Sequence, residues 1–67
     1  MNVQINGKLL VLPKQISLLA WIGNQNIPLA AVIVEYNGEI LSRDHWETTL
    51  LNEGDQVELL QFVGGGR

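Results

Sequence analysis

A chain of 67 residues that is 46% hydrophobic and 16% charged forms one small domain and is too apolar to be a disordered segment. Seven acidic and four basic side chains give a net charge of -3, which disfavours nucleic acid as a partner because cations dominate phosphate binding. The absence of cysteine excludes disulfides and thiolate chemistry, and the absence of a signal peptide or a long apolar run predicts a cytoplasmic protein without a membrane partner.

The chain opens with the pattern of a β-hairpin. Residues 1–6 alternate between apolar and polar side chains, which is typical of a half-buried strand. Asn6-Gly7 favours a type I′ turn, because that turn needs positive φ at both central positions. Residues 8–12 then form the return strand, and Pro13 ends it by removing a backbone donor.

A short helix of about two turns is expected after Ser17, whose hydroxyl can accept from the free amides of the first turn. Gly23-Asn24 is expected to supply the left-handed residue that ends it. One apolar face is formed by side chains spaced three and four residues apart, namely Leu18, Leu19 and Ile22.

Residues 29–36 are the most continuously apolar stretch and predict a strand buried on both faces in the middle of a sheet. Asn37-Gly38 predicts a second hairpin turn that leads into a short strand at 39–41. Residues 43–47 suit one polar helical turn with Trp46 directed inward.

A turn at 52–55 precedes the last strand, 56–63. The order is then hairpin, helix, hairpin, helical turn and final strand, in which the first and last strands can lie parallel at the sheet centre. This order predicts an α+β fold of the β-grasp (ubiquitin-like) type, with a mixed sheet of about five strands and one main helix packed across it. We expect a β-grasp domain at 1–63 and a flexible tail at 64–67.

Three consecutive glycines, Gly64, Gly65 and Gly66, follow the last strand. A tail without side chains can enter a channel too narrow for any Cβ, so it is interpreted as the part that enters a partner's active site. The alternative is that terminal glycines are only a frayed end or a linker.

The apolar residues outnumber what one helix can cover, so part of the last strand is expected on an open sheet face. Exposed apolar patches of this kind commonly serve as docking surfaces. We therefore predict that Leu60 and Phe62 form a surface on which a partner docks.

Four segments together resemble a known family: the opening strand with Asn6-Gly7, the block 32–40, the run 43–46, and the ending 53–66. The ending is the most specific, because a Gly-Asp turn, a strand and a terminal glycine run follow one another in a chain of this size. Over its whole length the chain resembles the ThiS family, the ubiquitin-like sulfur carrier proteins of thiazole (thiamin) biosynthesis.

The resemblance implies a protein that is a substrate and not an enzyme, with no cofactor bound to it. An E1-like adenylating enzyme of the ThiF type would use ATP-Mg to activate the carboxylate of Gly66. A sulfur donor such as a cysteine desulfurase would convert the adenylate into a thiocarboxylate. A thiazole synthase of the ThiG type would then receive the sulfur.

Arg67 departs from the family, whose members end in glycine. Three explanations stand beside one another: a peptidase removes Arg67, the activating enzyme tolerates it, or it does not belong to the natural chain. Removal is preferred, because it leaves Gly66 as the reactive end.

The remaining polar residues give no catalytic or metal-binding set. His45 is the single histidine and is expected at the surface, and the glutamates are scattered without the spacing of a carboxylate pair. They are interpreted as a solvated acidic surface, or as charges that steer the carrier to a basic rim on its partner. Two other functions stay open: a MoaD-like carrier for molybdopterin or another metabolite, and a non-covalent ubiquitin-like interaction module.

Overall fold

The structure, a computed structural model, describes residues 1–61. The strands are β1 (Asn2–Ile5), β2 (Lys8–Val11), β3 (Val32–Tyr36), β4 (Glu39–Leu41) and β5 (Gln56–Gln61). The helix α1 spans Leu18–Gly23, and two 3₁₀ turns span Leu29–Ala31 and Arg43–His45.

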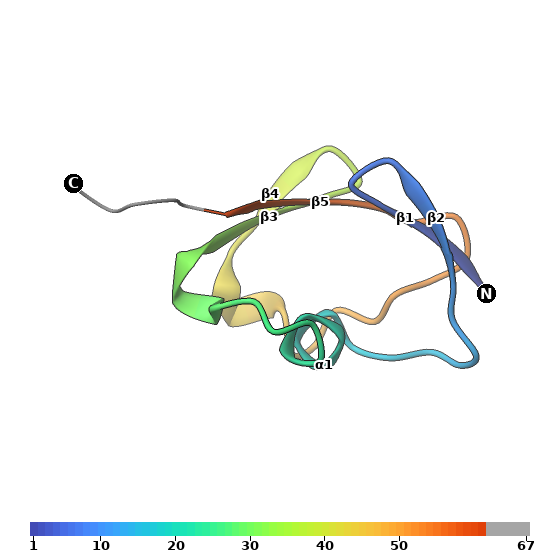
Figure 1. Cartoon of the computed structure of the whole chain (residues 1–67), viewed down its shortest axis with the longest axis horizontal. Coiled ribbons are helices and arrows are strands. Elements are labelled where there is room, and N and C mark those ends of the chain that lie inside the picture. The colour runs from blue at the N-terminus through green and yellow to red at the C-terminus, as the bar shows by residue number, and fades with distance from the viewer. Residues whose placement is uncertain (62–67) are drawn as a thin grey trace.

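The five strands form one mixed sheet in the order β2-β1-β5-β3-β4. β1 and β5 run parallel, and every other neighbouring pair runs antiparallel. Figure 1 shows α1, both 3₁₀ turns and the long connections on one side of the sheet. This arrangement confirms the predicted β-grasp architecture, with the first and last strands side by side at the centre.

Both predicted hairpin turns are present. Asn6 and Gly7 have φ values of 52° and 80°, and Asn37 and Gly38 have φ values of 51° and 90°. Positive φ at two successive residues is the geometry of a type I′ turn, whose twist matches that of the flanking strands. The two Asn-Gly pairs therefore set the register of β1 with β2 and of β3 with β4.

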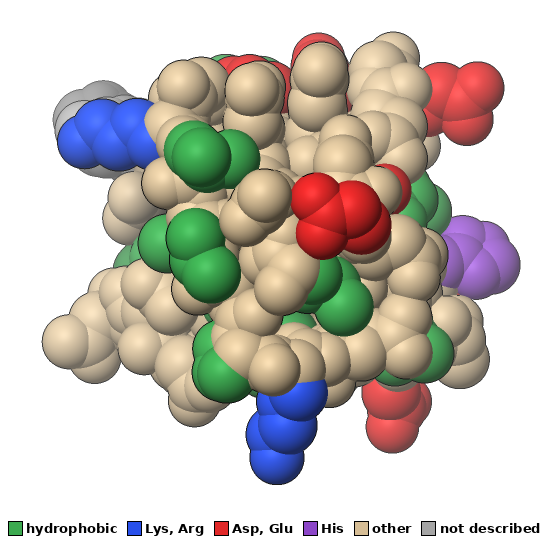
Figure 2. Space-filling model, turned by 90° about the vertical axis from the view of Figure 1, so that its right-hand side faces the viewer, with side chains coloured by type: hydrophobic (Ala, Val, Ile, Leu, Met, Phe, Trp, Pro, Cys, Tyr) green, Lys and Arg blue, Asp and Glu red, His purple; other side chains and the backbone are tan. Residues whose placement is uncertain are grey.

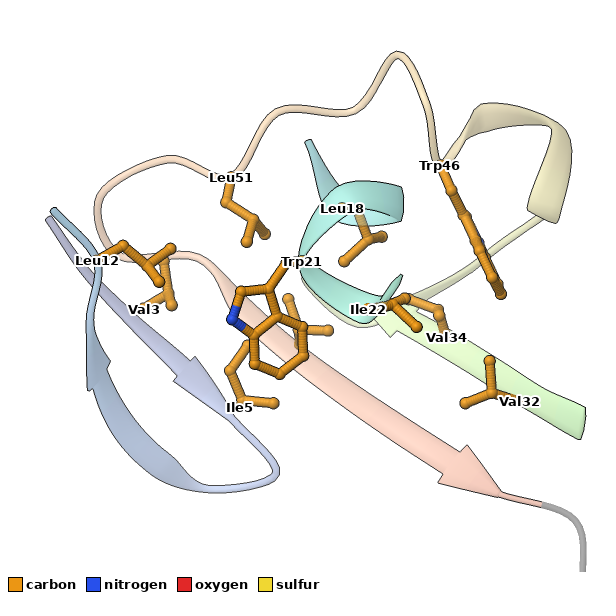
Figure 3. Close-up of a cluster of buried hydrophobic side chains, with 11 residues drawn as sticks. Val3, Ile5, Leu12, Leu18, Trp21, Ile22, Val32, Val34, Trp46 and Leu51 are labelled. Carbon is orange, nitrogen blue, oxygen red and sulfur yellow. The ribbon is translucent and has the colours of Figure 1, made fainter. Parts of the chain in front are cut away.

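The core lies between the sheet and α1 and contains apolar side chains from every layer (Figure 3). Trp46 is 1% exposed and its indole Nε1 donates to the Leu41 carbonyl at 3.1 Å, while Trp21 is also buried. Trp46 is thus directed inward, as predicted, and Trp21 is a core residue as well. The other buried apolar residues are Val3, Ile5, Leu12, Leu18, Ile22, Val32, Val34, Leu51 and Val57.

Two local predictions were wrong. Gly23 is the last helical residue and Asn24 is right-handed, with φ of -85°. The left-handed residue is Asn26, with φ of 58°, because the chain continues through a further turn before it reverses direction.

The segment 29–36 is also not a strand throughout. Its first three residues form a 3₁₀ turn, and the strand begins at Val32. Val32 and Val34 are buried against α1, whereas Ile33 and Glu35 alternate to the opposite face and are only half-buried. Since the helix covers one face only, β3 is buried on one side and not on both.

The Ser17 cap allows a matched test of the helix start. Its Oγ accepts from the Ala20 amide at 3.1 Å, whereas Ser42 precedes the second 3₁₀ turn without a side-chain capping bond. We expect Ser17→Ala to lower the free energy of unfolding by about 1 kcal/mol, because an amide of the first turn loses its acceptor. Ser42→Ala should leave it almost unchanged; equal losses in urea denaturation would contradict the capping role.

Candidate functional site

The site predicted from sequence lies at the end of β5, the central strand. Its last described residue, Gln61, pairs with Val32 of β3. Gly64, Gly65 and Gly66 lie outside the described residues, as does the boundary predicted between 63 and 64. An extended chain covers at most about 3.6 Å per residue, so the Gly66 carboxylate can reach no farther than about 18 Å from Gln61.

Hydrogen bonds from both hairpin turns hold β5 in place. The Leu59 amide donates to Asn6 Oδ1 at 2.7 Å, and the Gln56 amide donates to Asn37 Oδ1 at 2.8 Å. Two backbone amides of β5 thus find their hydrogen-bond acceptors in the side chains of the two turns. From the sequence both asparagines were predicted only as turn residues, and their bonds to β5 were missed.

Asp55, just before β5, is buried and connects three segments. Its Oδ2 accepts from the Tyr36 hydroxyl at 2.6 Å and from the Asn52 amide at 2.8 Å, and its Oδ1 accepts from Asn37 Nδ2 at 3.2 Å. The carboxylate therefore joins the end of β3, the β3–β4 turn and the start of β5. From the sequence Asp55 was predicted only as a turn residue, and the one signal for this connecting role was an aspartate directly before an apolar strand.

The hydroxyl of Tyr36 provides a spectroscopic readout of this connection. Burial, followed by the hydrogen bond to Asp55 and the negative charge of Asp55, raises the pKa of Tyr36 to about 12. The raised pKa means that between pH ~10 and 12 the folded protein holds a proton that the unfolded chain has lost, so stability falls as the pH rises through this range.

We therefore expect Tyr36, the single tyrosine, to ionise well above the ordinary range when tyrosinate absorbance is followed. In Asp55→Asn the loss of the negative charge should lower this pKa. An ordinary pKa in the native folded protein would contradict the contact with Asp55.

The face of the sheet opposite α1 carries an apolar group near the end of β5. Leu60 is 51% exposed and lies directly opposite Ile33 of β3. Ile40 of β4 is 69% exposed and lies opposite Glu35. We call Ile33, Ile40 and Leu60 the outer apolar patch. Phe62, the other predicted docking residue, lies outside the described residues, and the docking role of Leu60 stays a prediction.

A second apolar group lies on the edge strand β2, where Leu9 and Val11 are 65% and 69% exposed. Their strand partners on β1 are polar, namely Gln4 and Asn2. Figure 2, which views the right-hand end of Figure 1, shows hydrophobic side chains surfacing in separate small groups among polar ones. On the side of the molecule in this view, the exposed apolar surface is therefore divided into separate groups.

Metal-binding and membrane-spanning features were also sought in the part of the chain that the structure describes. His45 is exposed, as predicted, and residues 1–61 contain no group of three or more side chains suited to hold a metal ion. Within the same residues no helix is long and apolar enough to cross a bilayer.

A family model described as "ThiS family" matches residues 2–66. Among solved structures, the crystal structure of a thiamine biosynthesis protein (ThiS) from Geobacter metallireducens superposes with a TM-score of 0.84 at 33% identity, covering 98% of this chain and 100% of that one. A solution NMR structure of a thiamine biosynthesis protein from the same organism gives a TM-score of 0.78 at 33% identity, covering 100% and 90%.

Curated relatives include an uncharacterized protein, ycf40, of Pyropia yezoensis, which is 34% identical over 65 residues that cover 97% of this chain and 92% of that protein. A thiazole synthase of Paramagnetospirillum magneticum is 30% identical over 66 residues, which cover 98% of this chain. The chain spans only 20% of the length of that synthase.

Proposed function

The chain belongs to the ThiS family of sulfur carriers, and on this premise we propose that it carries sulfur as a thiocarboxylate on Gly66 for assembly of the thiazole of thiamin. The observation that carries the proposal is the extent of the family match, which runs from residue 2 to residue 66. The match includes all three glycines and ends before Arg67. Gly66 is therefore the residue whose carboxylate we assign as the attachment point.

The proposed chemistry has three steps. In the first, a carboxylate oxygen of Gly66 attacks the α-phosphorus of ATP-Mg on a ThiF-type enzyme, and pyrophosphate leaves. In the second, the terminal sulfur of a persulfide on a donor such as a cysteine desulfurase attacks the acyl carbon, and AMP leaves. In the third, a thiol reductant attacks the donor sulfur of the resulting acyl disulfide, which releases the Gly66 thiocarboxylate and leaves the donor in a disulfide with that thiol. Adenylation is needed because a free carboxylate lacks a good leaving group. The ATP-Mg belongs to the activating enzyme, and the carrier itself is a substrate with no cofactor.

The folded body supports this role by holding β5, which precedes the tail in the chain, at the centre of the sheet. β5 is flanked by β1 and β3, and its amides also bind Asn6 and Asn37. A strand held on both sides gives the tail a fixed origin, which reduces the entropy lost when the tail enters a partner's active site. Gly64, Gly65 and Gly66 would enter the narrow channel because they have no Cβ.

The proposed recipient of the sulfur is a thiazole synthase of the ThiG type. In the relative from Paramagnetospirillum magneticum, a segment similar to this chain makes up a fifth of a thiazole synthase. Two domains in one chain meet at a high effective concentration, so the fusion supports a functional contact between carrier and synthase. This relative and the thiamine biosynthesis proteins favour the thiazole branch over a MoaD-like carrier for molybdopterin.

The outer apolar patch supports a docking role near the origin of the tail. Leu60 precedes the tail on the same strand and is exposed on the sheet face that α1 leaves open. We propose that the activating enzyme contacts Leu60, and Phe62 beyond it, while it holds the glycines. The carrier would meet these partners in the cytoplasm, where ATP is available.

The proposal is tested by intact-mass spectrometry of the carrier ending at Gly66. With the ThiF-type enzyme and ATP-Mg, we expect a mass gain equal to one adenylyl group. With the sulfur donor and a thiol reductant added, we expect replacement of one oxygen by sulfur. A mass that never changes, while the carrier still binds the enzyme, would contradict the carrier function and favour a non-covalent ubiquitin-like module.

A further inference from the structure

Two carboxylates lie directly opposite one another in the middle of the open sheet face. In the register of β3 with β5, Glu35 pairs with Glu58. The next pair on the same face, two positions closer to the C-terminal end of β5, is Ile33 with Leu60. On the other side of β3, Ile40 lies opposite Glu35. Like charges at directly opposed positions destabilise a sheet, because neighbouring side chains lie within about 5.5 Å of one another.

Nothing in residues 1–61 neutralises this pair. Neither glutamate forms an ion pair or a side-chain hydrogen bond with a described residue. Packing does not require carboxylates here either, because Glu58 is exposed and Glu35 half-buried on a face without a covering layer. The pair thus weakens the isolated domain without a compensating contact among the described residues.

The position of the pair indicates what would neutralise it. The three residues of the outer apolar patch adjoin it, and Leu60 precedes the tail by only a few positions on the same strand. A guanidinium fits such a surface, since it binds two carboxylates through its planar fork and tolerates apolar surroundings better than an ammonium does. Apolar contacts around such a contact would exclude water and strengthen it.

We propose that Glu35 and Glu58, framed by Ile33, Ile40 and Leu60, bind an arginine on the surface of the adenylating enzyme. The inference rests on the proposed function, and it specifies the chemistry of the docking partner. The adenylating enzyme is preferred to the synthase because a site that binds ATP phosphates and a carboxylate has a positive potential, which an acidic surface beside the tail complements.

The test compares the stability and the enzyme affinity of carriers ending at Gly66 in which Glu35, Glu58 or both are replaced by Gln. Removing the repulsion should raise the melting temperature of the double variant by roughly 2–5 °C. The dissociation constant for the ThiF-type enzyme, measured by calorimetry, should rise roughly ten-fold and lose much of its salt dependence. Stability would therefore rise while affinity for the enzyme falls. A purely structural role of the two glutamates would instead lower stability and affinity together.

Glu47→Gln is the matched control for each single variant, because Glu47 is exposed and lies outside the sheet, and its replacement removes one negative charge as theirs does. It should leave the dissociation constant unchanged. The proposal is overturned if the double variant binds as tightly as the parent or loses stability. It is also overturned if Glu47→Gln weakens binding as much as Glu35→Gln or Glu58→Gln does. Failure of the carrier function would instead show as a parent protein that binds and is never adenylated.

Discussion

A carrier ending at Gly66 is expected to be adenylated at least ~100-fold faster than the same chain ending at Arg67. The reactive carboxylate must lie in line with the α-phosphorus, and a displacement of about 1 Å can cost 10²-fold in rate. Arg67 would move the carboxylate by a whole residue and would bring a long cationic side chain into a channel suited to glycine.

Single-turnover formation of the adenylate, followed by intact mass, measures this difference. A second comparison separates chain length from the arginine side chain. A chain ending in an additional glycine in place of Arg67 keeps the length and removes the side chain, so its rate reports displacement alone. Adenylation or sulfur transfer on the uncut Arg67 chain at the rate of the Gly66 chain would contradict the prediction.

Asp55→Ala is expected to lower the free energy of unfolding by about 3 kcal/mol. The substitution removes the acceptor of the Tyr36 hydroxyl, of the Asn52 amide and of Asn37 Nδ2, all in a region that is at least partly buried. A domain of this size has a total stability of only about 3–5 kcal/mol, so a large fraction of the variant should be unfolded.

Two milder variants show how much of the stability lost in Asp55→Ala comes from individual hydrogen bonds. Tyr36→Phe removes one donor and keeps the carboxylate, and it should cost about 1 kcal/mol. Asp55→Asn keeps an acceptor oxygen and should fall between the other two variants. Urea denaturation monitored by tryptophan fluorescence gives all three values, and a loss in Asp55→Ala no larger than that in Tyr36→Phe would contradict the role of Asp55 in joining the segments.

Most of the secondary structure could be predicted from local sequence, because its determinants lie within a few residues of one another. The Asn-Gly pairs at 6–7 and 37–38 adopt the positive φ values that define their turns. Ser17 caps α1 through an amide only three positions away. Both features depend on local backbone geometry, and the local sequence therefore predicted them correctly.

The family, too, was recognisable from sequence, because its glycine ending and Gly-Asp turn are contiguous. The match to the ThiS family over residues 2–66 agrees with the resemblance seen in those segments. The chemical role of the tail stays a prediction, since Gly64, Gly65 and Gly66 lie outside the described residues.

Tertiary structure alone decided which polar side chains meet. The bond from the Leu59 amide to Asn6 joins residues 53 positions apart, and the carboxylate of Asp55 meets Tyr36 across 19 positions. The register of β3 with β5 likewise brings Glu35 opposite Glu58 and Ile33 opposite Leu60. Local sequence patterns report propensity, alternation and the register within a hairpin, but not the register between strands that are distant in the sequence. That register determines whether distant charges and donors face one another.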